Sequence, residues 1–267
     1  MIESYLSAVA VAECDEMGHM NIQHYAAKAE AAADVLSALG NADRGRRGGP
    51  QQMHLRFHRE MLAGDRLRVT SARADDARSQ RLVHHIENAG TRLVCATAIS
   101  TYGTSRAPDA PAGAIADDAA PRSLTHPATH DLTQRDDHMV RTHLSAISPA
   151  DCRADTMTIP AFLQRVSRCQ AHLWALAGLD RRQQAQAGLG TASLELRVTR
   201  FAPALPGRPL EIVTSFTPPT GKALHYKHLG FDIVTGACCF MAEGVGVMID
   251  LRTRRAVKPP LAQSNFA

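Results

Sequence analysis

The chain has 267 residues, of which 45% are hydrophobic and 21% are charged, and its formal net charge is +4. These proportions are ordinary for a soluble globular protein with a real core, and the length suits one large domain or two of average size. Only 4% of the residues are aromatic, which argues against a nucleic-acid reader that stacks bases on aromatic platforms. The mild positive charge permits an anionic substrate but does not require a polyanion.

The sequence shows no sign of export or of a membrane span. The first residues have no basic segment, and the apolar run that follows is too short for a signal peptide. No stretch of 18 apolar residues occurs. The six cysteines form no CxxC pair, and most lie in apolar runs, so we expect them to be reduced. We therefore expect a cytoplasmic protein that does not associate with membranes.

The first half predicts a helix packed against a sheet. An apolar strand is expected over residues 5–12, and a helix follows from about Asn21 to Leu39, where apolar side chains recur every three or four positions. Gly40 is placed to end this helix. Strand-like segments follow at residues 53–61, 65–73 and 81–102, the last one with a turn near Asn88–Gly90. One long helix followed by sequential antiparallel strands predicts an α+β fold.

The second half repeats the first. "LSAVAVAEC" (6–14) recurs as "LSAISPADC" (144–152), with five identities in nine positions. "MNIQHY" (20–25) corresponds to "MTIPAF" (157–162), and "RFHREMLAGDRL" (56–67) to "RFAPALPGRPL" (200–210), in the same order. We therefore predict two homologous domains. The predicted organisation is a first domain over residues 1–105, a linker rich in Pro, Ala and Asp over 106–135, and a second domain over 136–267, whose helix runs from Pro160 to Gly178.

The polar turn before the first helix carries the chemistry of interest. Asp15 lies too early to be the N-cap of the helix, a role that Asn21 fits better. A helix amino terminus stabilises a nearby carboxylate, and its N–H groups can polarise a carbonyl oxygen. A carboxylate beside such a site can attack an acyl carbon or activate a water molecule. The alternative, that Asp15 only forms a turn, is equally compatible with the local composition.

"DEMGHMNIQHY" (15–25) resembles the D-x-x-G-H-x-N stretch of the hotdog-fold acyl-CoA thioesterases, the 4-hydroxybenzoyl-CoA thioesterase-like group. The matching positions are Asp15, Gly18, His19, Asn21 and Tyr25. "LRFHREMLAGDRLRV" (55–69) resembles the strand, loop and strand that follow the central helix in that group. The resemblance implies two tandem hotdog domains, each a long central helix wrapped by an antiparallel sheet, which together form an intramolecular pseudo-dimer.

The resemblance also implies an activity, the hydrolysis of an acyl-CoA or acyl-carrier thioester to the free acid and the thiol. Asp15 would act as nucleophile or general base, and backbone N–H groups near Asn21–Gln23 would polarise the carbonyl. No cofactor is implied beyond the coenzyme A of the substrate, and no metal; further association into homo-oligomers is left open. The implied catalytic residues are Asp15, Gly18, His19 and Asn21, and the implied substrate-binding residues are Ile22, Gln23, Tyr25, His58 and Glu60.

The second half departs from the motif. Depending on the direction of alignment, Asp15 falls on Arg153 or Cys152, and Gly18 and His19 become Asp155 and Thr156. One active cleft is therefore expected. A hotdog hydratase or dehydratase, and a non-catalytic acyl-thioester binding protein, remain as alternatives. "RGRRGG" (44–49) is either a contact for coenzyme A phosphates or a solvated loop. The strand histidines at positions 54, 58, 84 and 85 are expected to be exposed, although 58 or 84 is placed to line a pocket.

Overall fold

The computed structural model describes residues 1–40, 48–74, 79–103, 116–129, 133–136, 138–176, 179–217 and 221–259. By its internal contacts the chain divides into two compact units. Unit 1 comprises Met1–Arg122 and Asp151–Gln164, and unit 2 comprises Ser123–Ala150 and Arg165–Ala267. Within the described ranges, no helix is long and apolar enough to cross a membrane.

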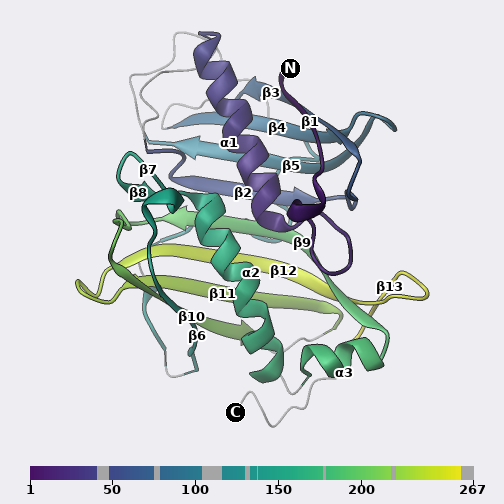
Figure 1. Cartoon of the computed structure of the whole chain (residues 1–267), viewed down its shortest axis with the longest axis vertical. Helices are drawn as coiled ribbons and strands as arrows, with labels where there is room; N and C mark the ends of the chain where they lie inside the picture. Colours follow the sequence, from purple (N-terminus) through teal and green to yellow (C-terminus); the bar gives the residue numbers. More distant parts are fainter. Residues whose placement is uncertain are drawn as a thin grey trace. The chain divides into compact units, whose positions relative to one another are not determined.

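Unit 1 contains one long helix on one face of an antiparallel sheet (Figure 1). The strands lie in the order β1-β3-β4-β5-β2, and a short hairpin from the second half of the chain belongs to the same unit. The elements are β1 (Ile2–Ala8), the 3-10 turn η1 (Val11–Glu13), α1 (Ile22–Ala38), β2 (Gln52–Phe57), β3 (Arg66–Arg73), β4 (Gln80–Asn88), β5 (Leu93–Tyr102), β7 (Cys152–Arg153) and β8 (Thr156–Met157).

Unit 2 repeats this strand order as β6-β10-β11-β12-β9, with β13 beside β12. A short helix that the sequence did not predict, α3, is capped by Asp180, whose carboxylate accepts the N–H of Gln183 at 2.9 Å. The elements are β6 (Val140–Ala146), η3 (Pro149–Asp151), α2 (Ile159–Leu176), α3 (Arg181–Gln186), β9 (Leu189–Arg200), β10 (Pro209–Thr217), β11 (Ala223–Asp232), β12 (Cys238–Asp250) and β13 (Arg255–Val257). The last residue of η3 and the start of α2, up to Gln164, belong to unit 1.

Alanine allows α1 to lie close to its sheet. Ala26, Ala29 and Ala32 are fully buried, so this helix contributes small side chains where larger ones would hold it away from the strands. Larger groups close the far end, where Leu36 packs with Leu82 of β4 and other buried side chains. The sequence predicted this helix to within one residue at each end, and Gly40 follows it with a φ of +74°.

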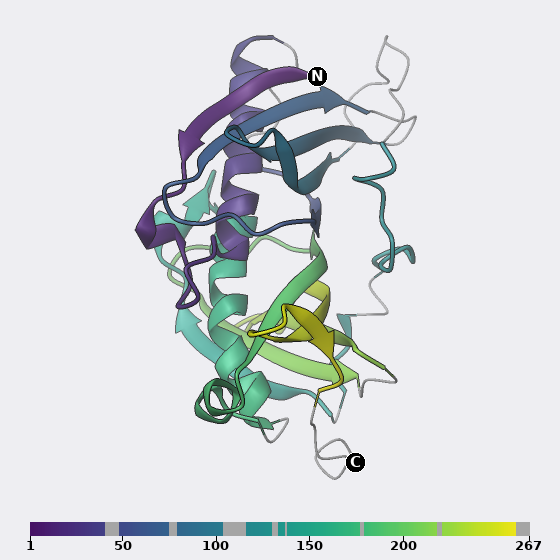
Figure 2. The ribbon, with the colours of Figure 1, turned by 90° about the vertical axis from the view of Figure 1, so that its right-hand side faces the viewer.

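The predicted linker contains a packed segment. In unit 1, Nη1 of Arg56 donates to the carbonyls of Asp117 and Ala120 at 2.8 and 2.9 Å, and Ala119 is fully buried. Figure 2 shows this teal segment on the side of the sheet away from α1. In unit 2, the backbone N–H groups of Ser123 and Leu124 donate to the Glu195 carboxylate. Composition alone indicated a spacer, because it does not report such docking.

Two local expectations need correction. The strand expected over residues 5–12 ends at Ala8, because residues 11–13 form a 3-10 turn. The expectation of exposed strand histidines is wrong for His54 and His84, which are 4% and 0% exposed. In the case of His84, Nδ1 lies 2.7 Å from the hydroxyl of Ser71, so the ring is buried with a polar partner. All six cysteines are free, as expected.

The two halves resemble each other in detail as well as in strand order. Strands β1 and β6 have the same alternation of buried and exposed positions. Each half also carries a buried row of two hydroxyls and one imidazole, with a spacing of 2.7 Å at every step. The rows are Ser4–Ser71–His84 in unit 1 and Thr142–Thr214–His228 in unit 2.

Candidate functional site

Residues 14–20, hereafter the Asp15 loop, form a closed loop before α1. Cys14 and Met20 pair across its neck, and the N–H of Asp15 donates to the carbonyl of His19 at 2.8 Å. At the tip, the N–H of Gly18 donates to the carbonyl of Asp15 at 3.0 Å. Gly18 has a φ of +80°, a conformation that other residues adopt with strain. The local sequence therefore closes a tight loop, whose backbone conformation at position 18 glycine adopts without strain.

The two oxygens of the Asp15 carboxylate differ in their hydrogen bonds. Oδ1 accepts the backbone N–H groups of Met17 and His19 at 2.9 and 3.1 Å. Oδ2 makes no hydrogen bond to any described residue, and Asp15 as a whole is half-buried. Asp15 therefore holds the loop together through one oxygen and leaves the other for a ligand or water.

The neck of the loop joins it to the start of α1. The N–H of Asn21 donates to the carbonyl of Glu13 at 2.9 Å, and that of Met20 donates to Met61 at 2.8 Å. Asn21 is the N-cap residue, but its side chain makes no capping hydrogen bond. Because the backbone N–H of Asn21 is engaged, the backbone donors that the helix start offers are those of its first turn, at Ile22 and Gln23.

The fold brings His19 and Glu60 together. Nε2 of His19 lies 3.4 Å from Oε2 of Glu60, and the two side chains are 16% and 34% exposed. Glu60 follows β2, and the backbone of His19 pairs with Leu62 in the same segment. An imidazole and a carboxylate at this distance form a pair that can accept and donate a proton.

A polar network that sequence reasoning missed lies beside the loop. Oε1 of Glu13 is 2.5 Å from Nζ of Lys28 and 3.8 Å from Nδ1 of His24. The side-chain nitrogen of Gln23 lies 3.3 Å from Nε2 of His24. One signal was present in the sequence: Glu13 and Lys28 correspond to an acid and an arginine, Asp151 and Arg165, in the second half.

Two of the expected substrate-binding residues, Tyr25 and His58, are engaged in contacts within the fold. Tyr25 is 3% exposed and its ring packs edge-on against Phe57 at a centroid distance of 5.3 Å, so it belongs to the core. Burial raises its pKa well above the ordinary value. His58 lies beside Thr97, with 3.4 Å between Nε2 and Oγ1. Thr97 also donates to the carbonyl of Asp118, which places His58 on the face opposite α1.

The corresponding turn of the second half is built without the motif. Cys152 pairs with Met157, and the N–H of Thr158 donates to the carbonyl of Asp151 at 2.9 Å, as Asn21 does to Glu13. Arg153, directly after the cysteine, donates two hydrogen bonds of 2.9 Å to the carboxylate of Asp34. The neck is thus a feature of the fold, whereas Asp15, Gly18 and His19 have no counterparts in the second half.

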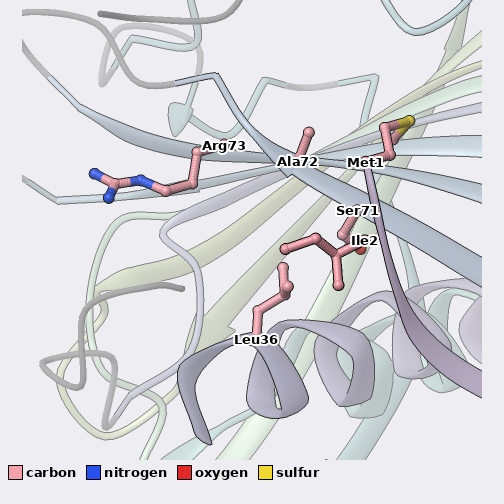
Figure 3. A pocket seen from close by; sticks show the side chains of 6 residues that line it. All are labelled: Met1, Ile2, Leu36, Ser71, Ala72 and Arg73. Carbon is pink, nitrogen blue, oxygen red and sulfur yellow. The ribbon is translucent and has the colours of Figure 1, made fainter. Parts of the chain in front are cut away.

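A cavity of about 260 Å³ lies at the other end of α1. Leu36 and Ile2 point toward Ser71 there, and Arg73 points away (Figure 3). Fourteen residues separate Ile22 from Leu36, which corresponds to about 21 Å of helix. The cavity therefore includes none of the expected site residues. Its walls are Met1, Ile2, Leu36, Ser71, Ala72 and Arg73.

Residues 9–112, which include the Asp15 loop and Glu60, match the family model of the thioesterase-like superfamily. This segment belongs to the thioesterase-like superfamily. A comparison with curated protein sequences found no match. The "RGRRGG" stretch, proposed above as a phosphate contact, lies within the segment, but residues 44–47 are outside the described residues.

Solved thioesterases share the fold over nearly the whole chain. A putative oleoyl thioesterase from Lactobacillus plantarum is 12% identical, with a TM-score of 0.66, covering 92% of this chain and 96% of its own. An acyl-ACP thioesterase from Bacteroides thetaiotaomicron is 10% identical, with a TM-score of 0.63, covering 91% of this chain and 96% of its own. The 12:0-ACP thioesterase from Umbellularia californica is 12% identical, with a TM-score of 0.61, covering 91% of this chain and 92% of its own. The chain therefore has the α+β hotdog fold that these thioesterases share.

Proposed function

We propose that the protein hydrolyses an acyl thioester of coenzyme A or of an acyl carrier to the free acid and the thiol. The observation that carries this proposal is the Asp15 loop, which presents a carboxylate oxygen just before a helix amino terminus in a segment of the thioesterase-like superfamily. The named activities of the three structural neighbours agree with this reaction class.

The chemistry follows from what each group offers. Asp15 either attacks the thioester carbonyl through Oδ2 or removes a proton from an attacking water. The first turn of α1 supplies N–H groups and the positive end of the helix dipole to the developing oxyanion. His19, held by Glu60, is placed to carry the proton that the departing thiolate requires. The carbon–sulfur bond breaks, and water supplies the hydroxyl of the acid and the hydrogen of the thiol.

We propose that the two halves are tandem hotdog domains that form one pseudo-dimer with one active cleft. The absence of the motif from residues 152–158 supports a single site. Asp155 is the acid of that turn, and it has a φ of +59° in a tighter loop than that of Asp15. The proposal therefore requires Asp15→Asn to abolish turnover and Asp155→Asn to leave it within about twofold of wild type. Equal damage by both variants would contradict a single site.

A thiol-release assay tests the activity. A panel of acyl-CoA and acyl-pantetheine thioesters of increasing chain length is offered to the wild type, Asp15→Asn and Asp155→Asn, and free thiol is measured. We expect release by the wild type and a loss of about 100-fold or more in Asp15→Asn, within the range found when a catalytic group is removed. Release that is unchanged in Asp15→Asn would overturn the assignment of Asp15.

One observation favours a second candidate. A hydratase or dehydratase needs an imidazole and an acid that converge on the acyl chain, and the His19–Glu60 contact supplies both groups. A change in enoyl-thioester absorbance without thiol release would establish this alternative. Binding of acyl-CoA without either reaction would instead indicate a non-catalytic acyl-thioester binding protein.

A further inference from the structure

The side chain of His24 lies against the amide of Gln23. It projects from the first turns of α1, and its Nε2 lies 3.3 Å from the side-chain nitrogen of Gln23. With the amide nitrogen of Gln23 facing the ring as donor, Nε2 accepts and carries no proton. In the neutral ring the proton then resides on Nδ1, which faces Oε1 of Glu13 at 3.8 Å. The ring thus lies between the amide of Gln23 and the carboxylate of Glu13.

Glu13 is itself firmly held. Its Oε1 pairs with Lys28 at 2.5 Å, and its Oε2 accepts the N–H of Ala10 at 3.0 Å. Nζ of Lys28 also reaches the hydroxyl of Tyr5 at 3.5 Å and lies 5.5 Å from the centre of that ring. Lys28 is 8% exposed, so this ion pair is shielded more than a surface pair. His24 therefore stands between a fixed carboxylate and the amide of Gln23.

The contact with Gln23 exists only while His24 is neutral. A protonated ring has a donor at both nitrogens, so Nε2 would then oppose the amide nitrogen of Gln23. Burial is the main cause that lowers the pKa of His24 below its ordinary value; Lys28 lowers it further and Glu13 opposes the change. Glu13, from the 3-10 turn, and Lys28, from α1, are the charged groups that face the ring. The neutral ring therefore persists to a lower pH than in an exposed histidine.

We propose that His24 is a positioning residue that fixes the Gln23 amide at the first turn of α1 for contact with the acyl thioester. The proposal rests on the proposed function and adds to it a residue that touches no reacting atom. The second half lacks the arrangement, since Pro160 and Ala161 occupy the positions of Gln23 and His24. That half has an acid, Asp151, and a cationic side chain, Arg165, at the positions of Glu13 and Lys28. The oppositely charged positions therefore occur in both halves, whereas the histidine occurs in one.

Kinetics with three variants test the proposal. His24→Leu is expected to raise KM about three- to tenfold, the value of one hydrogen bond, with kcat within about twofold of wild type. His24→Gln, which keeps an acceptor, should recover most of this loss. Gln23→Ala should raise KM equally, and the double variant should be no worse. Independent, additive losses in the double variant, or an unchanged KM in His24→Leu, would overturn the proposal.

The pH profile separates positioning from a merely structural role. In the wild type, KM should rise as the pH falls through the pKa of His24, whereas KM of His24→Leu should depend less on pH. His225→Leu, which removes an exposed histidine of β11, is the matched control and should keep the wild-type profile. Identical profiles in the wild type and His24→Leu would count against the proposal.

Two measurements do not depend on turnover. The ¹⁵N chemical shifts of His24 should show the Nδ1–H tautomer in the wild type and a mixture in Gln23→Ala. Calorimetric binding of an S-alkyl-CoA thioether, which cannot be hydrolysed, should show the same losses as KM. If the wild type binds the thioether but releases no thiol, the hydrolase assignment fails and His24 is judged by the binding data. If the wild type neither binds nor hydrolyses, both proposals fail.

Discussion

Nε2 of His19 lies 3.4 Å from Oε2 of Glu60, so the loop before α1 and the segment after β2 meet through an imidazole and a carboxylate. The two residues are 41 positions apart in the sequence, and the backbone pairing of His19 with Leu62 brings Glu60 to the loop. This contact gives the imidazole of the Asp15 loop a carboxylate partner from a distant segment of the chain.

We predict that His19 and Glu60 act as one unit. Glu60→Gln and His19→Gln should each lower kcat/KM by about tenfold or more, because each leaves its partner without the opposite group. The double variant should lose much less than the product of the two effects. The kcat/KM of all three variants is measured by thiol release. Glu87→Gln, which removes the carboxylate that Arg68 pairs with at 2.5 Å on neighbouring strands, is the control. Multiplicative losses at 19 and 60 would contradict the coupling.

Gly18→Ala should destabilise the protein through backbone strain alone. Gly18 has a φ of +80°, and a Cβ there would meet no atom within 4 Å, so no clash contributes. The expected loss is about 1 kcal/mol in the free energy of unfolding, measured by urea denaturation. Gly221→Ala is the control, because that glycine also has open space around it but no positive φ. Equal effects of the two substitutions would show that the loop does not require this conformation.

The two N-cap residues should respond differently to alanine. Oγ1 of Thr158 accepts the N–H of Ala161 at 3.3 Å, whereas the side chain of Asn21 makes no capping bond. Thr158→Ala should therefore cost about 1 kcal/mol of unfolding free energy and leave kcat/KM unchanged. Asn21→Ala should cost less stability and lower kcat/KM. Urea titration and thiol release are measured on both variants; a reversed pattern would remove Asn21 from the site.

His228 should make the protein sensitive to acid. The ring is fully buried, and burial lowers its pKa from 6.5 to about 3. As the pH falls below about 6.5, His228 of the unfolded chain binds a proton, whereas the buried ring of the folded protein stays neutral. Stability from this group is thus complete above pH 6.5 and is lost progressively toward pH 3, by about 3 kcal/mol at pH 4.

The variant His228→Gln isolates this contribution. Its glutamine does not titrate, so the unfolding free energy should fall less steeply between pH 6.5 and 4 than in the wild type, even though stability at pH 7 is lower. His225→Gln replaces an exposed histidine of the same strand and should keep the wild-type slope. Parallel pH profiles for the wild type and His228→Gln would show that the buried ring does not titrate as expected.

The sequence by itself determined the features that depend on neighbouring residues. The three- and four-residue spacing of apolar positions located α1, and the Asp, Gly and Asn of the turn located the loop, because periodicity and turn chemistry are local. The internal repeat also showed that a neck of this kind forms with other residues: Arg153 and Asp155 take the places of Asp15 and Gly18 in the second half.

Only the tertiary structure decided which side chains meet. His54 and His84 looked like exposed strand positions, yet both are buried, because a sheet covered on both faces has no open side. His58 was expected to bind substrate and lies on the face of the sheet opposite α1, since strand alternation separates it from the side that α1 covers. The Glu13–Lys28–His24 network and the His19–Glu60 contact depend on helix packing and strand register. Those geometries arise between distant segments, where local sequence patterns carry no information.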